Sequence, residues 1–125
     1  TMAYIKNYLE RQLNNGQDVL LYDQNQQILE TTSSNVFFIK GNILFSPKPE
    51  TVLPGIMREF VLDLCQQHHF QINQSPVSIS QLSEFDEVFV TNSISEVQLV
   101  DKIEGVDLKS GQTAQNIQRL VRENY

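Results

Sequence analysis

Apolar residues recur along the chain in short runs separated by polar turn residues, which is the pattern of β-strands. The clearest run spans 36–39 and is followed by Gly41 and Asn42, and then by a second apolar run at 43–45. A Gly-Asn pair between two apolar runs is typical of a tight turn, so this segment is predicted to be a β-hairpin. The same signals predict further strands over 19–22, 28–31, 70–72, 88–90 and 97–103.

Apolar residues at helical spacing predict helices elsewhere, over 3–14, over 56–69, over 79–82 after a Ser78 cap, and after Gly111. In the first, Ile5, Leu9 and Leu13 recur at intervals of four and form one apolar stripe. Strands and helices mixed in one chain of 125 residues predict a single α/β domain over residues 1–125.

Composition narrows the class of protein. The hydrophobic content of 40% and the charged content of 19% are ordinary globular values, and no window is apolar over the roughly 18 residues that a membrane-spanning helix needs. The net charge is −6, with nine basic residues scattered among fifteen acids, which argues against a nucleic-acid partner. We therefore expect no membrane and no nucleic-acid partner. Because no leader segment is visible, a cytoplasmic location is the expectation.

The chain has one cysteine, Cys65, so an internal disulfide is excluded. It falls within the apolar pattern of the helix predicted over 56–69. The simplest interpretation is a small buried hydrophobic residue rather than a reactive thiol.

Two stretches carry candidate chemistry. In the first, Glu30 precedes four hydroxyl residues and Asn35 at the mouth of the predicted hairpin. This is either an ordinary polar loop or a rim of ligand-binding groups. In the second, Pro54 and Gly55 run directly into a helix, whose first amides lack intrahelical partners and lie at the positive end of the helix dipole. Those amides bind either water or an anion.

Two other pairs of neighbouring polar residues do not indicate a functional site. His68 and His69 are adjacent at a helix end, with no cysteine or acid at ligand spacing, so no metal site is expected. Asp86 and Glu87 are neighbours on a predicted strand and point to opposite faces, so they cannot share one proton.

Three short motifs, taken together and in order, resemble the C-terminal domain of the fold-type IV pyridoxal-phosphate enzymes, the class IV aminotransferase family. They are E-x-x-x-x-N-x-F, then P-G-I-x-R opening a helix, then D-E-V-F-x-T-N-S-x-x-E-V ending a strand, found here over Glu30–Phe37, Leu53–Arg58 and Asp86–Val97. The resemblance covers essentially all 125 residues. It implies the D-amino-acid aminotransferase-like fold, a barrel-like mixed sheet with flanking helices.

The resemblance also implies a cofactor, pyridoxal 5′-phosphate, and roles for particular residues. Glu30 would pair with the pyridine nitrogen and keep it protonated, so that the ring accepts electrons from the substrate. The backbone amides of Ile56 and Met57 would bind the phosphate, helped by the Ser93 hydroxyl. The positions facing cofactor or substrate oxygens would be Ser33, Ser34 and the amide of Ile94.

Two further residues in these motifs have roles that stay open. Asn35 is interpreted as a structural clamp on the turn. Arg58 either contacts the phosphate or forms an ion pair with an acid such as Glu59 or Glu96.

Enzymes of this family form a Schiff base with a lysine, whose place by the resemblance falls immediately before Thr1. The nearest lysine, Lys6, does not match that place and is interpreted as a helix-surface residue. The resemblance therefore implies that the chain is the second domain of a larger two-domain enzyme and is inactive alone. The parent enzyme is expected to be a homodimer that acts on a small amino substrate.

The family contains several activities, and two details favour one of them. Aminotransferases usually carry threonine in place of Met57, whereas the G-I-M-R sequence and Thr91–Ser93 resemble 4-amino-4-deoxychorismate lyase. That enzyme releases pyruvate and forms 4-aminobenzoate for folate synthesis. The alternatives are a D-amino-acid or branched-chain transaminase and, from a different class, a non-catalytic folded fragment or interaction module.

Overall fold

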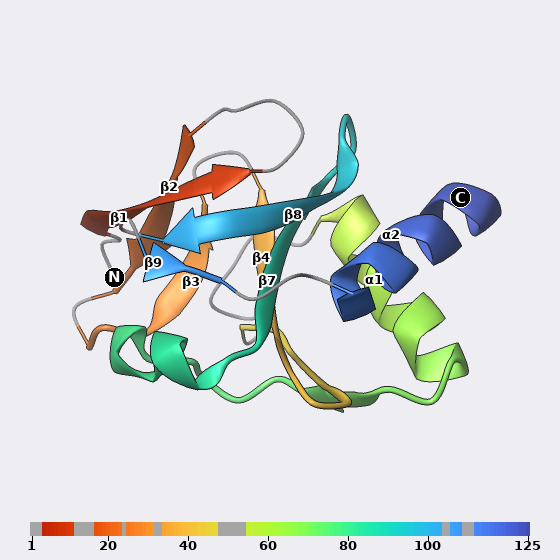
Figure 1. Cartoon of the computed structure of the whole chain (residues 1–125), viewed down its shortest axis with the longest axis horizontal. Helices are drawn as coiled ribbons and strands as arrows, with labels where there is room; N and C mark the ends of the chain where they lie inside the picture. Colours follow the sequence, from red (N-terminus) through yellow and green to blue (C-terminus); the bar gives the residue numbers. More distant parts are fainter. Residues whose placement is uncertain are drawn as a thin grey trace.

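A computed structural model describes residues 4–11, 17–23, 25–31, 34–47, 55–103, 106–108 and 112–125, and covers only the backbone over 4–11, 17–19 and 106–107. The strands are β1 (Tyr4–Arg11), β2 (Gln17–Tyr22), β3 (Ile28–Thr31), β4 (Asn35–Lys40), β5 (Ile43–Phe45), β6 (Gln71–Asn73), β7 (Glu87–Asn92), β8 (Glu96–Ile103) and β9 (Val106–Asp107). The helices are α1 (Ile56–Gln67), the 3₁₀ helix η2 (Ile79–Glu84) and α2 (Gln112–Asn124). Figure 1 shows α1 and α2 together on one side of the strands.

The described strands form one mixed sheet in the order β3-β2-β1-β8-β7-β4-β5-β6, with β9 beside β8. Neighbouring strands are antiparallel except β5 and β6, which are parallel. The segment that follows β6 crosses to the opposite edge, where the Ile28 amide donates to the Val77 carbonyl. The predicted mixed α/β fold with flanking helices is confirmed, and the sheet curls without closing into a barrel.

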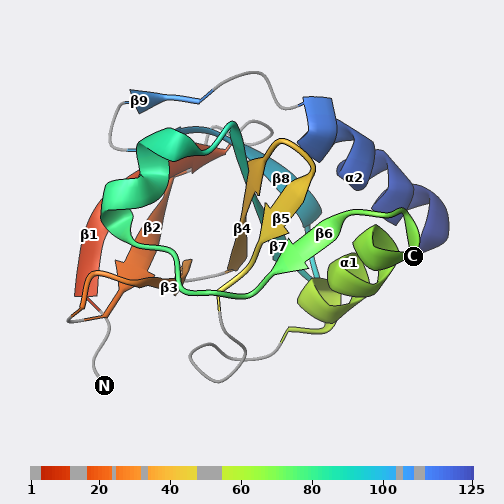
Figure 2. The same cartoon turned by 90° about the horizontal axis from the view of Figure 1, so that it is seen from below.

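The sheet has a core on each face. The helix-side core lies between the sheet and the two α-helices and consists of Phe37, Ile39, Leu44, Met57, Val61, Leu62, Leu64, Cys65, Phe89, Val97, Leu99, Ala114, Ile117 and Val121. The inner core lies within the curl of the sheet and consists of Leu20, Ile28, Val36, Phe38, Val77, Phe85, Val88, Val90, Val100 and Ile103. Figure 2 shows η2 on the side of the molecule away from α1 and α2. Apolar residues on both faces explain why β4 and β7 read as continuous apolar runs.

Most predicted elements are confirmed. The hairpin over 36–45 turns at Gly41, whose φ of 60° suits a residue without a Cβ, and the Gly41 amide donates to the Asp86 carboxylate. Ser78 begins η2 with a reciprocal capping box, in which the Gln81 side chain accepts from the Ser78 amide.

The helix predicted over 3–14 is wrong. Residues 4–11 form β1, which pairs with β2 on one side and β8 on the other. The error has a geometric cause, because residues four apart lie on one face of a regular strand as well as on one face of a helix, although in β1 a register shift between Ile5 and Asn7 interrupts that alternation. Ile5 and Leu9 therefore could not distinguish the two, and pairing with two neighbouring strands determined the outcome.

The start of α2 depends on a residue that sequence patterns did not single out. Glu87 on β7 is 7% exposed, and its carboxylate accepts hydrogen bonds from the amides of Thr113 at 3.3 Å and Ala114 at 2.7 Å. A carboxylate from a distant strand therefore satisfies amides in the first turn of α2 and complements the helix dipole.

Replacing Glu87 with alanine is expected to lower the free energy of unfolding by about 2 kcal/mol, because a cap is lost and a buried amide is left without an acceptor. Urea denaturation measures the change. Glu123→Ala, at an exposed position on the last turn of α2, is the matched control and should change stability by less than about 0.5 kcal/mol. Equal losses in the two variants would contradict the capping role.

Among the described residues, neither α1 nor α2 nor the short η2 has the length and apolar character that crossing a membrane would require.

Candidate functional site

The first turn of α1 has backbone amides without a partner inside the helix. Gly55 is the N-cap, in an extended conformation, and within the described residues no side chain caps this helix end. The first hydrogen bond of the helix runs from the Glu59 amide to the Gly55 carbonyl at 3.0 Å. The amides of Ile56 and Met57 precede that bond and have no partner within the helix. A helix start of this kind can bind either water or an anion.

The side chains of these two residues do not supply the binding groups. Ile56 is 74% exposed, whereas Met57 is buried in the helix-side core. Any ligand contact by Met57 therefore comes from its backbone, and a methionine or a threonine at this position would offer the same amide.

Asn35 holds the start of β4 against the start of α1. A Cβ atom added to Gly55 would lie 2.4 Å from Asn35 Oδ1, so the asparagine side chain occupies the space that any other residue at position 55 would need. This contact supports the interpretation of Asn35 as a structural clamp.

Next to Asn35, and paired with it across the ladder, is Thr91 of β7. Directly paired residues project to the same face of a sheet, so Thr91 lies on the Asn35 side. Its side chain is fully buried, and among the described residues its Oγ1 has no hydrogen-bond partner. The buried Thr91 hydroxyl thus lies beside a helix start that no described side chain caps. Within the described residues, both features leave polar groups in this region without hydrogen-bond partners.

The β7–β8 turn is organised by a single side chain. Asn92 Oδ1 accepts from the amides of Ile94 at 3.0 Å and Ser95 at 2.7 Å, and Asn92 Nδ2 donates to Ser34 Oγ at 2.9 Å. Ser93 is exposed, and Ile94 is 95% exposed. The amide of Ile94, predicted to face a ligand oxygen, thus already has an acceptor in this structure.

Glu30 lies on β3, where it pairs with Leu21 of β2 and is half-buried. Its neighbour Thr31 pairs with Leu20, a residue of the inner core, and is 3% exposed. Since successive strand residues point to opposite faces, Glu30 projects from the outer face of β3. That is the face away from the inner core.

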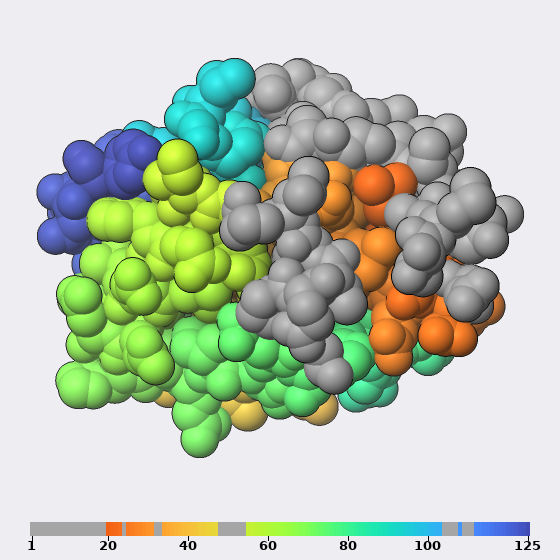
Figure 3. Space-filling model, turned by 180° about the vertical axis from the view of Figure 1, so that it is seen from behind, coloured from red at the N-terminus to blue at the C-terminus, as the bar shows by residue number. Residues whose placement is uncertain are grey.

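A tight link brings β3 next to β4. The Thr31 amide and the Thr31 hydroxyl both donate to the Ser34 carbonyl, at 2.9 and 3.2 Å. Ser34 in turn accepts from Asn92, and Asn35 contacts Gly55. These contacts therefore connect the Glu30 strand, the β7–β8 turn and the start of α1. Figure 3 shows β3, α1 and the cyan β7–β8 turn reaching one face of the molecule.

Arg58 is buried and bonded to protein groups. Its side chain is 1% exposed, with Nη1 2.6 Å from the Glu59 carboxylate and Nη2 donating to Ser46 Oγ and to the Pro47 carbonyl, each at 3.0 Å. Of the two alternatives, the ion pair with Glu59 is the one observed. Arg58 ties α1 to the segment that follows β5.

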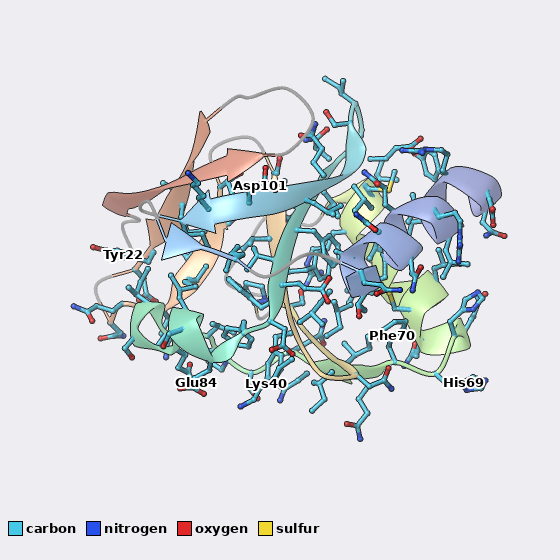
Figure 4. The ribbon with its side chains drawn as sticks, viewed as in Figure 1. Tyr22, Lys40, His69, Phe70, Glu84 and Asp101 are labelled. Carbon is cyan, nitrogen blue, oxygen red and sulfur yellow. The ribbon has the colours of Figure 1, made fainter. Side chains whose placement is uncertain are left out.

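The other polar candidates lie away from these contacts. His68 is the C-cap of α1 and His69 follows it, at the lower edge in Figure 4, where Lys40 and Glu84 also lie. The β7–β8 turn is at the upper edge of the same view. Within the described part of the chain, no group of three or more potential metal-binding side chains is found.

Cys65 is buried as predicted, and burial raises its pKa to about 12 from an ordinary value of 9.0. Between these values the thiol ionises in the unfolded chain but not in the folded one, so folding becomes less favourable as pH rises above about 9. Wild type is expected to lose about 1.4 kcal/mol relative to Cys65→Ala between pH 8 and pH 10, measured by urea denaturation. A stability difference that does not change with pH would show that the thiol ionises equally in both states.

Several predicted positions fall outside the described residues. These are Ser33, Leu53, Pro54 and the side chain of Lys6. Conversely, the sequence analysis did not single out Asn92 or Thr91 individually. An asparagine directly after a buried strand is a recognised turn signal, and it could have identified Asn92.

Comparison with curated proteins identifies relatives with two activities. The chain is 33% identical over 108 residues to branched-chain-amino-acid aminotransferase 6 of Arabidopsis thaliana, covering 84% of this chain and 30% of that protein. It is 36% identical over 85 residues to a D-alanine aminotransferase of Bacillus licheniformis, covering 67% of this chain and 30% of that protein. The chain thus spans about a third of the length of these relatives.

Solved structures share the fold. A candidate 4-amino-4-deoxychorismate lyase of Legionella pneumophila matches with a TM-score of 0.81 and 27% identity, over 86% of this chain and 41% of that one. An aminotransferase of Brucella abortus bound to pyridoxal phosphate matches with a TM-score of 0.79 and 29% identity, over 85% and 38%.

A family model supplies the decisive match. The model for amino-transferase class IV covers residues 1–103, which is most of the chain. Enzymes of this class use pyridoxal phosphate, the cofactor that the sequence motifs implied. With the fold and the family model in agreement, the chain belongs to the class IV aminotransferase family.

Proposed function

We propose that this chain is the C-terminal, cofactor-binding domain of a two-domain pyridoxal-phosphate enzyme. The observation that carries the proposal is the connected set of contacts that links Glu30 on β3, the Asn92 turn and the amides that begin α1. The relatives are about three times as long as the chain, which supports a parent with a further domain.

The residues present fit the cofactor. Phosphate binding requires unpaired donors without a competing side-chain cap, and the Gly55 N-cap provides that arrangement. The contact between Gly55 and Asn35 allows the start of β4 to lie close to the backbone at the start of α1. The buried Thr91 hydroxyl lies on the same face. These features support phosphate at the start of α1.

In the proposed site each residue binds one part of the cofactor. The amides of Ile56 and Met57 and the Ser93 hydroxyl hold the phosphate. Glu30 accepts a hydrogen bond from the protonated pyridine nitrogen. When bound, pyridoxal phosphate supplies an electron sink for the carbanion formed at the amine-bearing carbon of the substrate. Holding the proton on the ring nitrogen is therefore the contribution of Glu30 to the reaction rate.

The proposed reaction is the elimination of pyruvate from 4-amino-4-deoxychorismate, which leaves 4-aminobenzoate. The G-I-M-R start of α1 and the asparagine in Thr91–Ser93 support this choice, as does the similarity to the Legionella pneumophila structure. In the parent enzyme, the base that removes the substrate proton would be the lysine whose place falls before Thr1. The parent enzyme is proposed to be a cytoplasmic homodimer.

A transaminase is the second candidate, because the curated relatives are a branched-chain and a D-alanine aminotransferase. The two activities diverge only after proton removal, so the residues described here serve either one. Pyruvate release from 4-amino-4-deoxychorismate is therefore the distinguishing measurement, since transamination of D-alanine also yields pyruvate.

The test uses the complete protein that carries this chain. Incubation with 4-amino-4-deoxychorismate is expected to release pyruvate and 4-aminobenzoate in equal amounts, without a keto-acid acceptor. Pyruvate is measured with lactate dehydrogenase and 4-aminobenzoate by chromatography. Amino-group transfer from D-alanine or a branched-chain amino acid to 2-oxoglutarate, with no pyruvate from the first substrate, would replace the lyase by a transaminase. If the protein shows neither activity, the result would favour the non-catalytic alternative.

A further inference from the structure

The Asn92 side chain has only one possible orientation. A backbone N–H can donate but cannot accept, so the side-chain atom that contacts the amides of Ile94 and Ser95 must be the carbonyl oxygen, Oδ1. The amino group, Nδ2, is then the atom that lies 2.9 Å from Ser34 Oγ. An amide NH₂ group donates and does not accept, so the Ser34 oxygen is the acceptor in this bond.

This arrangement restricts the direction of the Ser34 hydroxyl. A serine oxygen that accepts from Asn92 cannot direct its own hydrogen back along the same line. The O–H bond therefore points away from Asn92. Ser34 follows the Thr31–Ser34 link, beside the strand that carries Glu30. Asn92, at the end of β7, thus excludes one direction in which the Ser34 hydroxyl between β3 and β4 could donate.

We propose that Asn92 is a positioning residue, which orients the Ser34 hydroxyl to donate to an oxygen of the bound cofactor or substrate. The inference rests on the proposed cofactor site and adds a residue that acts through another. Asn92 does not itself contact the ligand, because its oxygen is engaged by two backbone amides and its amino group by Ser34.

Asn92→Asp separates this role from simple support of the turn. Aspartate retains the oxygen that caps the amides of Ile94 and Ser95, and it is as well suited to such turns as asparagine. Its second oxygen, however, accepts rather than donates, so the Ser34 hydroxyl would turn to donate to it. The hydrogen bond would reverse, while the turn would stay capped.

The experiment measures binding of pyridoxamine 5′-phosphate to the complete protein that carries this chain by fluorescence titration, because this ligand forms no Schiff base with a lysine. Asn92→Asp is expected to weaken binding about tenfold, as expected when a hydrogen bond to a charged group is lost. Its urea-denaturation midpoint should match that of wild type. Asn92→Ala, which removes the cap, should lower that midpoint.

Aspartate also adds a negative charge, which repels a phosphate, and Ser34→Ala controls for that effect. If Asn92 acts through Ser34, the effect of Asn92→Asp should fall to less than about threefold in the Ser34→Ala background, since only the electrostatic part remains. The same tenfold loss in both backgrounds would overturn the inference and leave the cofactor site intact. No binding by the complete wild-type protein would overturn the proposed cofactor site, and this inference with it. The inference would also be contradicted if Asn92→Asp destabilised the protein as much as Asn92→Ala does.

Discussion

Replacing Glu30 with glutamine in the complete enzyme is expected to lower kcat by about 10- to 100-fold. In the proposed site the carboxylate stabilises the protonated pyridine nitrogen, and a hydrogen bond to a charged group contributes about 1.5–3 kcal/mol. Glutamine has a similar shape but no charge, so the nitrogen would lose its proton and the ring would accept electrons less readily. Steady-state rates at saturating substrate measure the effect.

The matched control for this prediction is Glu84→Gln. Glu84 is exposed and pairs with Lys40 at 3.9 Å, at the edge of the molecule opposite the β7–β8 turn (Figure 4). The Glu84→Gln variant should leave kcat unchanged within about twofold, because surface ion pairs contribute little to stability. If Glu30→Gln behaved like Glu84→Gln, Glu30 would not be the partner of the pyridine nitrogen.

Replacing Gly55 with alanine is expected to weaken pyridoxamine 5′-phosphate binding by at least about tenfold and to lower the free energy of unfolding by about 1–3 kcal/mol. The new Cβ would meet Asn35 Oδ1 at 2.4 Å, so either the clamp or the start of α1 must move. Movement of the first turn would misplace the amides of Ile56 and Met57. Fluorescence titration and urea denaturation of the 125-residue chain measure the two effects.

A second substitution tests the cause of that effect. In the Asn35→Ala background the obstructing oxygen is absent, so adding Gly55→Ala should cost less stability than it does in wild type. Equal costs in the two backgrounds would show that the contact with Asn35 is not what makes alanine unfavourable.

Local signals predicted the elements that form through short-range contacts. The Gly41 turn closes a hairpin between adjacent strands, and Ser78 caps η2 through residues two and three positions away. Such features are readable because the partners are close in sequence. The helix α1 was also predictable, since its apolar residues cover one face over three turns.

Long-range partners explain what could not be predicted. The β1 segment pairs with β8, about 90 residues away in sequence, and a spacing of four did not distinguish strand from helix. Glu87 caps a helix that begins 25 residues later, and Asn92 bonds Ser34 across 58 residues. In each case the sequence contains the residue type but not the identity of its partner.

The candidate site could be predicted in part from the sequence. The motifs predicted a start of α1 without a side-chain cap, which the described residues show, because that motif is continuous in sequence. They did not predict that Asn92 would already engage the Ile94 amide, since that bond depends on the conformation of the turn. The buried Arg58 was left with two possible roles, and only the folded chain shows its ion pair with Glu59.

A crystal structure of the chain with pyridoxamine 5′-phosphate tests the central claim most directly. The phosphate is predicted to lie within hydrogen-bond distance of the Ile56 and Met57 amides, with the ring nitrogen about 2.7–2.9 Å from a Glu30 oxygen. A ligand whose phosphate lies elsewhere, or whose ring nitrogen is out of reach of Glu30 while the phosphate is in place, would contradict the account.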